Sequence, residues 1–519
     1  MISMRTLFEK KSVKIIAIIL ALLFSLSFYL WGVTLTDNYY WIYNSRFLED
    51  NIMCKLSIEG MKVWYSIFGF TLLSSRMLAW ILNVSSVLIP YLFLLKKEKR
   101  KKYIYYLCVA LIIMGPGIAK CCTPDCFTAS MLSILMVVFI KFIQRNHKIV
   151  FGLLLCISTA LLIAIRFPNI VVVPFVAIFI VLMMDGIAKW QYAIGYMVLS
   201  LVIYWLVMTL LLGDTNCISL LGDAFAKESG NPNGRHSLIG LILRYCKSIL
   251  LALIALFSII IACITRTRLF FRRQKLGFII AIVVGTFLSY SILGRIGEKF
   301  HSWPVCIAPL VSLSLLYVVY YAFKNKDYTN AWLCLFLGLV IFIPSAGSDT
   351  GFQKSLMSAC GIIPIAVVKY INVHKKMLYI NIALGIMLST SVLMYCDNIS
   401  NNNAVSSDKK LWGVFLNKKQ LEHNQMIKEE LKPYYRTNHT VFYGLEAHYW
   451  YFYTDTKPLY NPGFWMLKND ESALDNAIAS LKRDPNNVFI DFTKSDTNCF
   501  IRKGIKLVVE TDFYNIYKY

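Results

Sequence analysis

The stretch TLTDNYYWIYNSRFLED, residues 34–50, begins where the first long apolar run of the sequence ends. It places an aspartate, Asp37, at that boundary and continues with aromatic residues. Tyr40, Tyr43 and Phe47 recur at helical spacing, and the charged residues fall mostly on the other side. This spacing predicts an amphipathic helix in a membrane interface, with Asp37 at its start and facing the cleft between that helix and the apolar runs.

The composition indicates a membrane protein. Of the 519 residues, 57% are hydrophobic and 16% are charged, whereas a soluble chain carries about a quarter charged residues. Apolar runs of about 17–22 residues recur, a length that crosses about 30 Å of hydrocarbon. We therefore expect a polytopic α-helical membrane protein with about 13 transmembrane helices. The expected spans lie near 15–33, 75–95, 103–119, 126–143, 149–165, 169–184, 191–212, 248–264, 277–293, 304–323, 329–343, 356–371 and 377–395.

The formal net charge is +24, and the basic residues gather in short clusters between the apolar runs. This is the positive-inside pattern, and it argues against nucleic acid as a partner. It predicts a cytoplasmic N-terminus and an extracytoplasmic C-terminal tail, in the inner (plasma) membrane if the cell is bacterial. The basic, cytoplasmic loops are 96–102, 141–148, 266–275, 324–327 and 369–376, with a weaker member near 185–190.

The first apolar run has a basic flank, as a signal peptide does, but it is too long and no small-residue cleavage site follows it. We interpret it as an uncleaved first span. Most of the 14 cysteines lie in apolar runs, and Cys499 alone lies beyond Cys396, so no disulfide framework is expected. Cys121, Cys122 and Cys126 match no common zinc spacing, so no metal site is assigned to them.

The long connecting segments lie on the predicted outer side, so function is expected there. The chain divides into a transmembrane domain, 1–395, and a soluble extracytoplasmic domain, 396–519. The first outer loop, 34–74, holds the interfacial helix described above and a second one expected near Met61–Phe70.

The tail has the pattern of a small α/β domain. Its aromatic-rich stretch, 447–465, fits contact with sugar rings or the membrane, or a place in the domain core. Strands are expected near 440–444, 488–492 and 506–519, and a helix near 471–483.

Two further charged residues stand at the edges of apolar runs. Asp125 follows Pro124 in a tight outer turn before the fourth span. An ionisable group is costly there, which favours a function, and helix capping is the alternative for Asp125 as for Asp37. Arg166, in AIRFPN (164–169), interrupts a long apolar region. It is either an anion ligand on the outer side or a snorkelling residue that marks a turn.

Two later outer loops carry cations where the positive-inside pattern predicts few. The cations of GRIGEKFHSWP, 294–304, suit a lipid phosphate, and pairing of its glutamate with a neighbouring cation is the alternative. The segment PSAGSDTGFQKS, 344–355, either covers a bound headgroup or is a plain loop. The candidate residues of these two loops are Arg295, Lys299, His301, Asp349 and Lys354.

Together these segments resemble the GT-C superfamily of membrane glycosyltransferases. The resemblance is strongest to glycosyltransferase family 39, in its protein O-mannosyltransferase and lipid A aminoarabinose transferase branch. It rests on the acid that ends the first span, on SSRMLAWILN (74–83) at the second span, on the PD turn before the fourth span and on RFPN (166–169). It covers mainly residues 1–210 and implies a GT-C fold.

The resemblance implies transfer of a sugar from a polyprenyl-phosphate-linked donor to an acceptor hydroxyl on the outer face, with inversion. Asp37 matches the family's first-loop acid and would act as general base, and Asp125 matches the second acid. Arg166 and the later cations would face the lipid phosphate, and Tyr40 would contact substrate. Members of the family usually carry two acids in the first loop. This sequence reads TDN there, so Asp37 is the single candidate for the general base.

Several alternatives stay open. The acceptor is a lipid, a glycan or a protein, and a divalent cation between an acid and the phosphate is not shown by any ligand set. A transporter or flippase of lipid-linked glycans would place charges near mid-membrane, often in repeated halves. A polymerase or ligase would favour a late outer loop rich in Arg and His, of which 213–247 is a modest version. A membrane scaffold without enzyme activity is the remaining alternative.

Overall fold

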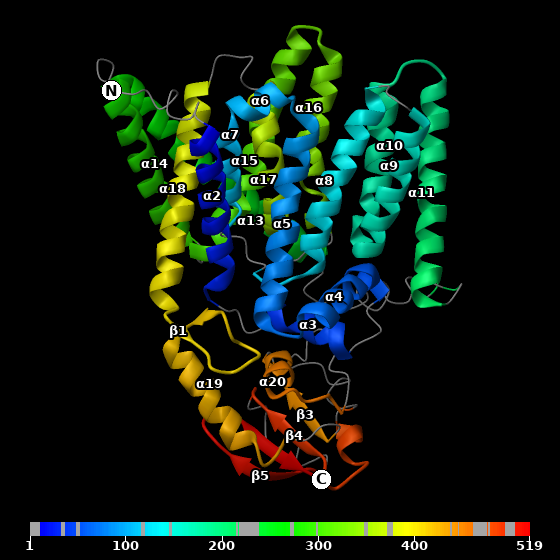
Figure 1. Cartoon of the computed structure of the whole chain (residues 1–519), viewed down its shortest axis with the longest axis vertical. Coiled ribbons are helices and arrows are strands. Elements are labelled where there is room, and N and C mark those ends of the chain that lie inside the picture. The colour runs from blue at the N-terminus through cyan, green and yellow to red at the C-terminus, as the bar shows by residue number, and fades with distance from the viewer. Residues whose placement is uncertain are drawn as a thin grey trace.

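A computed structural model shows a long helical bundle and a smaller unit beyond one end of it (Figure 1). We call the smaller part, residues 404–519, the C-terminal unit, and the adjoining end of the bundle the C-unit end. The structure describes residues 11–32, 37–47, 52–115, 120–144, 148–213, 216, 219, 238–269, 274–296, 299–346, 351–370, 377–435, 439–444, 446–459, 475, 478–493 and 504–519.

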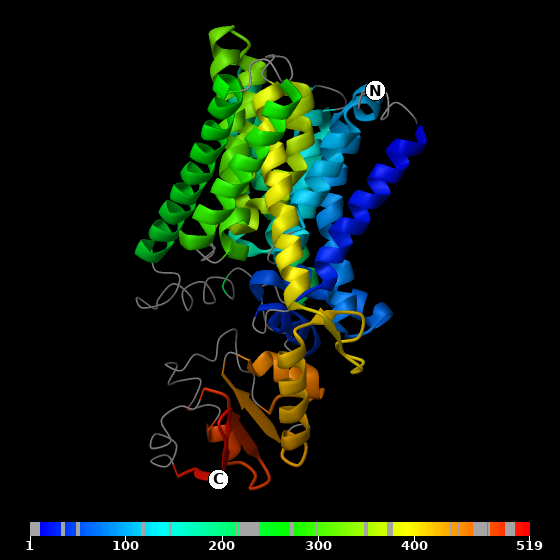
Figure 2. The same cartoon turned by 90° about the vertical axis from the view of Figure 1, so that its left-hand side faces the viewer.

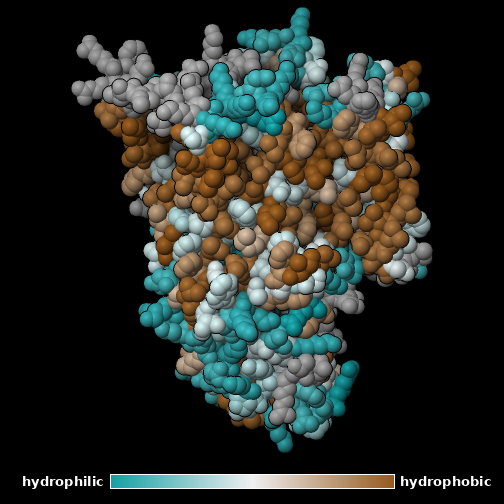
Figure 3. Space-filling view, viewed as in Figure 1, coloured by the Kyte–Doolittle hydropathy of each residue, from teal (hydrophilic) through white to brown (hydrophobic). Residues whose placement is uncertain are grey.

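The described part of the bundle contains an apolar helix for each span expected from the sequence. Nine helical segments are long and apolar enough to cross a membrane, and four apolar helices are shorter. On the face shown in Figure 3, hydrophobic residues cover the middle of the bundle, and hydrophilic ones gather at its two ends and on the C-terminal unit. The chain is thus a polytopic α-helical membrane protein. The helices are α2 (Lys11–Leu30), α5 (Leu72–Leu94), α7 (Ile104–Ile113), α8 (Pro124–Ile143), α9 (Lys148–Ile165), α10 (Val172–Met183), α11 (Ala188–Leu212), α13 (Leu238–Leu269), α14 (Gln274–Ile296), α15 (Lys299–Lys324), α16 (Tyr328–Val340), α17 (Leu356–Ile365) and α18 (Met377–Asn401).

Two outer segments that were expected to be loops are partly helical. α13 begins at Leu238, inside the loop expected over 213–247, because its apolar residues recur at helical spacing before the long apolar run begins. α14 and α15 extend into the turn expected over 294–304, since its charged residues are compatible with helix. The basic helix α6 (Lys97–Lys102) lies at the opposite end of the bundle from the C-terminal unit (Figure 1).

The bundle is most tightly packed around α17, every residue of which is buried. A Cβ atom at Gly361 would lie 2.5 Å from the backbone oxygen of Ser86 in α5. Ser133 of α8 donates a hydrogen bond to the same oxygen at 2.7 Å. Small residues therefore let three helices approach closely, as is usual inside membrane proteins.

The segment that the sequence predicts to be the first outer loop, called below the first outer segment, forms α3 (Asp37–Phe47), η1 (Ile52–Cys54) and α4 (Lys55–Phe68) at the C-unit end. The amphipathic pattern expected for α3 is wrong, because its polar Asn44 and Ser45 are as buried as its tyrosines. Tyr40 and Tyr43, on the side that was expected to face the membrane, pack on the C-terminal unit. By contrast, α4 leaves Val63, Ile67 and Phe68 exposed, so an interfacial position for this helix stays a prediction.

The C-terminal unit follows directly from α18 (Figure 2). Its four-stranded sheet has the order β3-β4-β6-β5, with β3 parallel to β4 and the other pairs antiparallel. The expected strands form, and the last of them is split into β5 and β6 by a turn at Thr511–Tyr514. Its elements are β1 (Ala404–Val405), β2 (Phe415–Leu416), α19 (Lys418–Leu431), β3 (Thr440–Tyr443), α20 (Ala447–Thr454), β4 (Val488–Asp491), β5 (Lys506–Glu510) and β6 (Asn515–Lys518).

The aromatic stretch expected over 447–465 is core in its described first half. Residues 447–453 belong to α20 and are all buried, and the ring of Trp450 stacks on Phe492 at 5.0 Å. Of the helix expected over 471–483, residues 475 and 478–481 are helical, and residues 471–474, 476 and 477 lie outside the described residues.

Candidate active site

Asp125 stands in the first turn of α8, at the C-unit end. Pro124 is the first helical residue, where the fixed proline φ suits a helix start. The carboxylate lies 3.1 Å from the amine of Lys354 and 3.6 Å from Nε of Arg166. The positive end of the α8 dipole also favours a carboxylate at this position. The sequence therefore predicted the place of Asp125 but not its two cationic partners.

Arg166 is held where α9 ends and η2 (Phe167–Val171) begins. It has an extended backbone, and Pro168 follows as a helix breaker. The side chain is 7% exposed, and its Nη1 donates to the backbone oxygen of Pro344 at 2.8 Å. Arg166 is therefore buried and turned toward other elements, so the alternative of a residue that snorkels to water is wrong.

Lys354 reaches Asp125 from η4 (Gly351–Ser355). Gly351 has a φ of +63°, and a Cβ there would lie 2.3 Å from Oγ of Ser248 in α13. Glycine is thus required for η4 to lie against α13. The hydroxyl groups of Ser355 and Ser345 are 2.7 Å apart, which ties η4 to η3 (Ile343–Ser345). The loop expected over 344–355 is therefore anchored on both sides of its undescribed part.

Asp125, Arg166 and Lys354 form what we call the ion cluster, which brings together three of the residues selected from the sequence. It contains two cations and one carboxylate, so it has a surplus of positive charge that favours an anion. Oδ1 of Asp125 is buried and accepts no hydrogen bond within the described part of the chain, and Nε of Arg166 lies 3.6 Å from it. The cluster therefore has the charge of an anion-binding site.

The first outer segment adjoins the ion cluster. Ser57 of α4 donates to the backbone oxygen of Ile165, the residue before Arg166, at 3.2 Å. Asp37 is the first residue of α3, which packs on α4. The structure gives the backbone of Asp37 and leaves its side chain outside the description. Both acids chosen from the sequence thus begin helices at the same end of the bundle.

The end of α2, just before this segment, is enclosed by cations that sequence reasoning missed. Arg76 is fully buried, and its guanidinium donates to the backbone oxygens of Tyr29 and Gly32. Lys120 donates to the oxygen of Trp31 and, at 3.1 Å, to Oδ1 of Asn398. These donors satisfy carbonyls that have no partner within the helix and complement its dipole. We call Gly32, Arg76, Lys120 and Asn398 the α2 cage.

Gly32→Ala is expected to destabilise the protein by about 1–3 kcal/mol. Gly32 has a φ of +77°, and a Cβ would lie 2.7 Å from Oδ1 of Asn398 and 2.9 Å from Nζ of Lys120. Thermal unfolding in detergent measures the loss. Gly69→Ala is the matched control, since Gly69 has a φ of +82° with open space around it. Equal losses of stability in Gly32→Ala and Gly69→Ala would show that contacts with Asn398 and Lys120 add nothing to the cost of the left-handed backbone.

Lys120 is expected to make the stability of the protein depend on pH. Burial, and next the charge of Arg76, lower the pKa of Lys120 to about 7. An unfolded lysine titrates near 10.4, so the unfolded chain binds more protons between these values and stability rises with pH there, by about 1.4 kcal/mol per pH unit. Unfolding of wild type and Lys120→Met between pH 7 and pH 9.5 tests this. If the unfolding free energies of wild type and Lys120→Met changed in parallel with pH, the pKa of Lys120 would not be lowered.

The remaining candidates are placed as follows. Tyr40 is buried, with its ring edge-on to His448 of α20 at 5.0 Å, so it contacts the C-terminal unit. Arg295 lies in the last turn of α14, and Lys299 and His301 lie at the start of α15, with side chains outside the description. Asp349 lies outside the described residues. The substrate roles of these five residues stay predictions.

No group of three or more His, Cys, Asp or Glu side chains that could hold a metal ion occurs in the described part of the chain. Cys121, Cys122 and Cys126 are buried and free. Two apolar hollows lie among the helices. One of about 390 Å³ is lined by α13, α15, α17 and α18, and one of about 520 Å³ lies between α14 and α18.

Comparison with known proteins finds similarity only among solved structures. No family model and no curated protein matches the chain. ArnT from Cupriavidus metallidurans, bound to undecaprenyl phosphate, aligns over 97% of each chain with 10% identity and a TM-score of 0.38. Its apo form aligns over 97% of each chain with 11% identity and a TM-score of 0.38. The oligosaccharyltransferase of Archaeoglobus fulgidus aligns over 94% of this chain and 69% of its own, with 13% identity and a TM-score of 0.48.

With TM-scores below 0.5, these alignments carry no argument about the superfamily or the activity of this chain.

Proposed function

We propose that this chain is a membrane glycosyltransferase that moves a sugar from a polyprenyl-phosphate-linked donor to an acceptor hydroxyl. The observation that carries the proposal is the ion cluster. Two cations, one of them buried, share a single carboxylate at the end of a membrane bundle and beside the segment that begins with Asp37. A surplus of positive charge at a membrane edge suits the phosphate of a lipid-linked donor.

The chemistry assigns a role to each group. The acceptor oxygen attacks the anomeric carbon from the side opposite the phosphate, so a new C–O bond forms, the bond to the phosphate oxygen breaks, and the configuration inverts. Asp37 accepts the hydroxyl proton. The phosphate leaves with the bonding electrons, and Arg166 and Lys354 stabilise its growing negative charge. Asp125 holds these two cations in place, so we assign it a positioning role rather than that of a second base.

The charge pattern supports an orientation for this reaction. The basic helix α6 lies at the end of the bundle opposite the C-terminal unit, which by the positive-inside rule is the cytoplasmic end. The ion cluster and the C-terminal unit then face the outside, in the inner (plasma) membrane if the cell is bacterial. The donor's apolar chain enters from the bilayer, and the acceptor arrives from water.

The proposal is tested by deleting the gene and restoring wild type, a Lys354→Met variant or Asp185→Asn at equal membrane levels. Mass spectrometry then compares surface glycans with polyprenyl-phosphate sugars. Deletion should remove one sugar from its acceptor and cause its lipid donor to accumulate, and wild type should reverse both. Asp185 is exposed in the turn between α10 and α11, so Asp185→Asn should act as wild type. Unchanged lipid-linked sugars in the deletion strain would contradict the proposal.

A further inference from the structure

The helix that begins with Asp37 is packed directly on the C-terminal unit. α3 lies against α20 through a continuous set of aromatic rings. The ring of Tyr39 lies 4.9 Å from Tyr449 and 5.2 Å from Phe452, and Tyr43 stacks on Tyr451 at 5.2 Å. Aromatic pairs at such distances stabilise contacts beyond their buried area. The position of α3 is therefore set by α20 as much as by the bundle.

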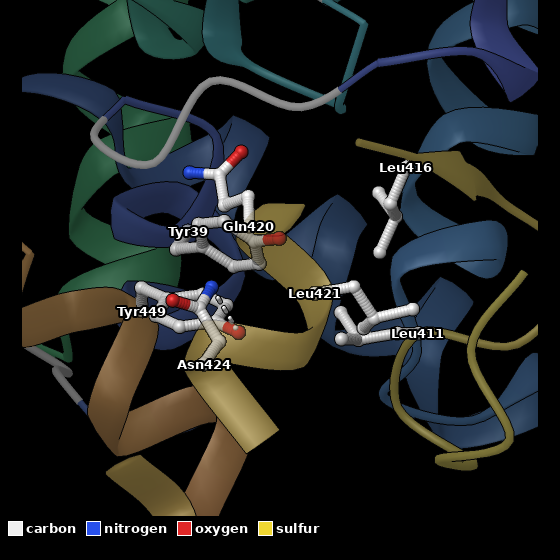
Figure 4. Close-up of a pocket in the computed structure, with 7 residues that line it drawn as sticks. All are labelled: Tyr39, Leu411, Leu416, Gln420, Leu421, Asn424 and Tyr449. Carbon is white, nitrogen blue, oxygen red and sulfur yellow. Dashed lines mark hydrogen bonds between the residues drawn. The ribbon is translucent and has the colours of Figure 1, made fainter. Parts of the chain in front are cut away.

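Figure 4 shows how closely this contact is fitted. Tyr39 and Tyr449 lie beside Gln420 and Asn424 of α19, around a small hollow of about 10 Å³. Asn424 donates a hydrogen bond to the hydroxyl of Tyr449 at 3.0 Å. Helices α19 and α20 of the C-terminal unit thus enclose Tyr39, which lies in the first turn of α3, two residues after Asp37.

An ion pair links the C-terminal end of α3 to the C-terminal unit. Arg46, in its last turn, is hydrogen-bonded to the carboxylate of Asp455, which also lies 3.1 Å from the amine of Lys410. Asp455 follows α20 directly and has a φ of +57°. Partial burial acts to raise the pKa of Asp455, but hydrogen bonds from Lys410 and Arg46 outweigh it and keep the pKa below its usual value. The pair is therefore charged at neutral pH.

The chain just before Asp37 is held by the same unit. The ring of Trp31 stacks on Phe415 of β2 at 4.3 Å, with the two planes 8° apart. The backbone N–H of Gly32 donates to the oxygen of Phe415 at 2.9 Å. The segment that carries Asp37 is thus fixed on both sides, at Gly32 and at α3, by contacts with the C-terminal unit.

We infer that the C-terminal unit is a positioning part of the catalytic centre, in which Asp455 and Phe415 set the place of Asp37. This inference rests on the proposed function. A shift of about 1 Å in a reacting group can cost about 100-fold in rate. A unit that holds a catalytic segment at both ends prevents such a shift. Asp455 and Phe415 are positioning residues, since they act through α3 and the end of α2.

Asp455→Asn tests the inference, because it removes the charge while asparagine tolerates the left-handed backbone. Hydrogen exchange of residues 37–47 reports the hold on α3 independently of activity. Turnover is measured as consumption of lipid-linked sugar in donor-loaded membranes of the deletion strain. We expect faster exchange over α3 and a fall in kcat of about tenfold with KM for the donor unchanged. Asp512→Asn is the matched control, since Asp512 is exposed in the turn before β6.

Each outcome decides the inference. Faster exchange together with lower kcat, in Asp455→Asn but not in Asp512→Asn, supports it. Faster exchange with unchanged kcat overturns the inference, because α3 is then less firmly held without any effect on turnover. The proposed function is not affected by that result. Unchanged exchange and kcat also overturn the inference, and Phe415→Ala repeats the test at the other side of the segment. If wild type consumes no lipid-linked sugar, the proposed function fails and the inference fails with it.

Discussion

Asp37→Asn is expected to slow sugar transfer by about 10²- to 10⁴-fold, the usual contribution of a general base. Asparagine keeps the size of the side chain and can still cap α3, but it cannot accept the acceptor's proton. The first outer segment reads TDN at this point, so no neighbouring acid can replace the lost base. The effect should fall on kcat, since donor binding rests on the cations of the ion cluster.

The measurement is the initial rate of lipid-linked sugar consumption in donor-loaded membranes of the deletion strain. Asp185→Asn is the control for a carboxylate removed elsewhere, and thermal unfolding shows whether either variant is misfolded. The wild-type rate should fall at acid pH as the base becomes protonated, and the residual rate of Asp37→Asn should lack that step. Full activity of Asp37→Asn at equal protein level would make Asp37 a helix cap, and the transporter and polymerase alternatives would move ahead.

The fold was predictable where a single physical quantity determines it. Apolar length alone predicted a helix at every expected span. The hydrocarbon of a bilayer offers no water to the backbone, and a helix satisfies its own backbone hydrogen bonds. Strand pattern placed β3 and β4 within a residue. The prediction for α3 was wrong because its tyrosines pack on α20, about 400 residues later in the chain. No local pattern reports such a partner.

The candidate site was predictable in part for the same reason. Asp125, Arg166 and Lys354 could be selected because charges at the ends of apolar runs are costly and thus conspicuous. Their meeting in one cluster depends on tertiary packing. Arg76 stands in the quoted segment SSRMLAWILN, and Lys120 directly precedes Cys121, but neither residue received a role. Their partners are backbone carbonyls at the end of α2, which have no sequence signature.

Arg166→Met is expected to lower the rate of transfer by about 10²- to 10³-fold, the loss seen when one preorganised donor to a developing negative charge is removed. Methionine fills a similar volume but offers no donor to a phosphate. Arg166→Lys is the matched control for charge, and it should recover part of the rate because one amine replaces a planar fork of donors.

A structural role for Arg166 makes a different prediction. If Arg166 acts only through its pairing with Asp125, Arg166→Met has no further effect on the rate once Asp125→Asn has removed that partner, so the double variant should match Asp125→Asn. If Arg166 faces the donor phosphate, Arg166→Met lowers the rate in the Asp125→Asn background as well. Thermal unfolding of each variant shows whether a lower rate reflects misfolding. The coupling energy of this cycle separates the two roles, because Arg166→Met is compared with and without its carboxylate partner. Equal rates of Asp125→Asn and the double variant would remove Arg166 from the donor site, and the ion cluster would then be a structural pair at the end of α8.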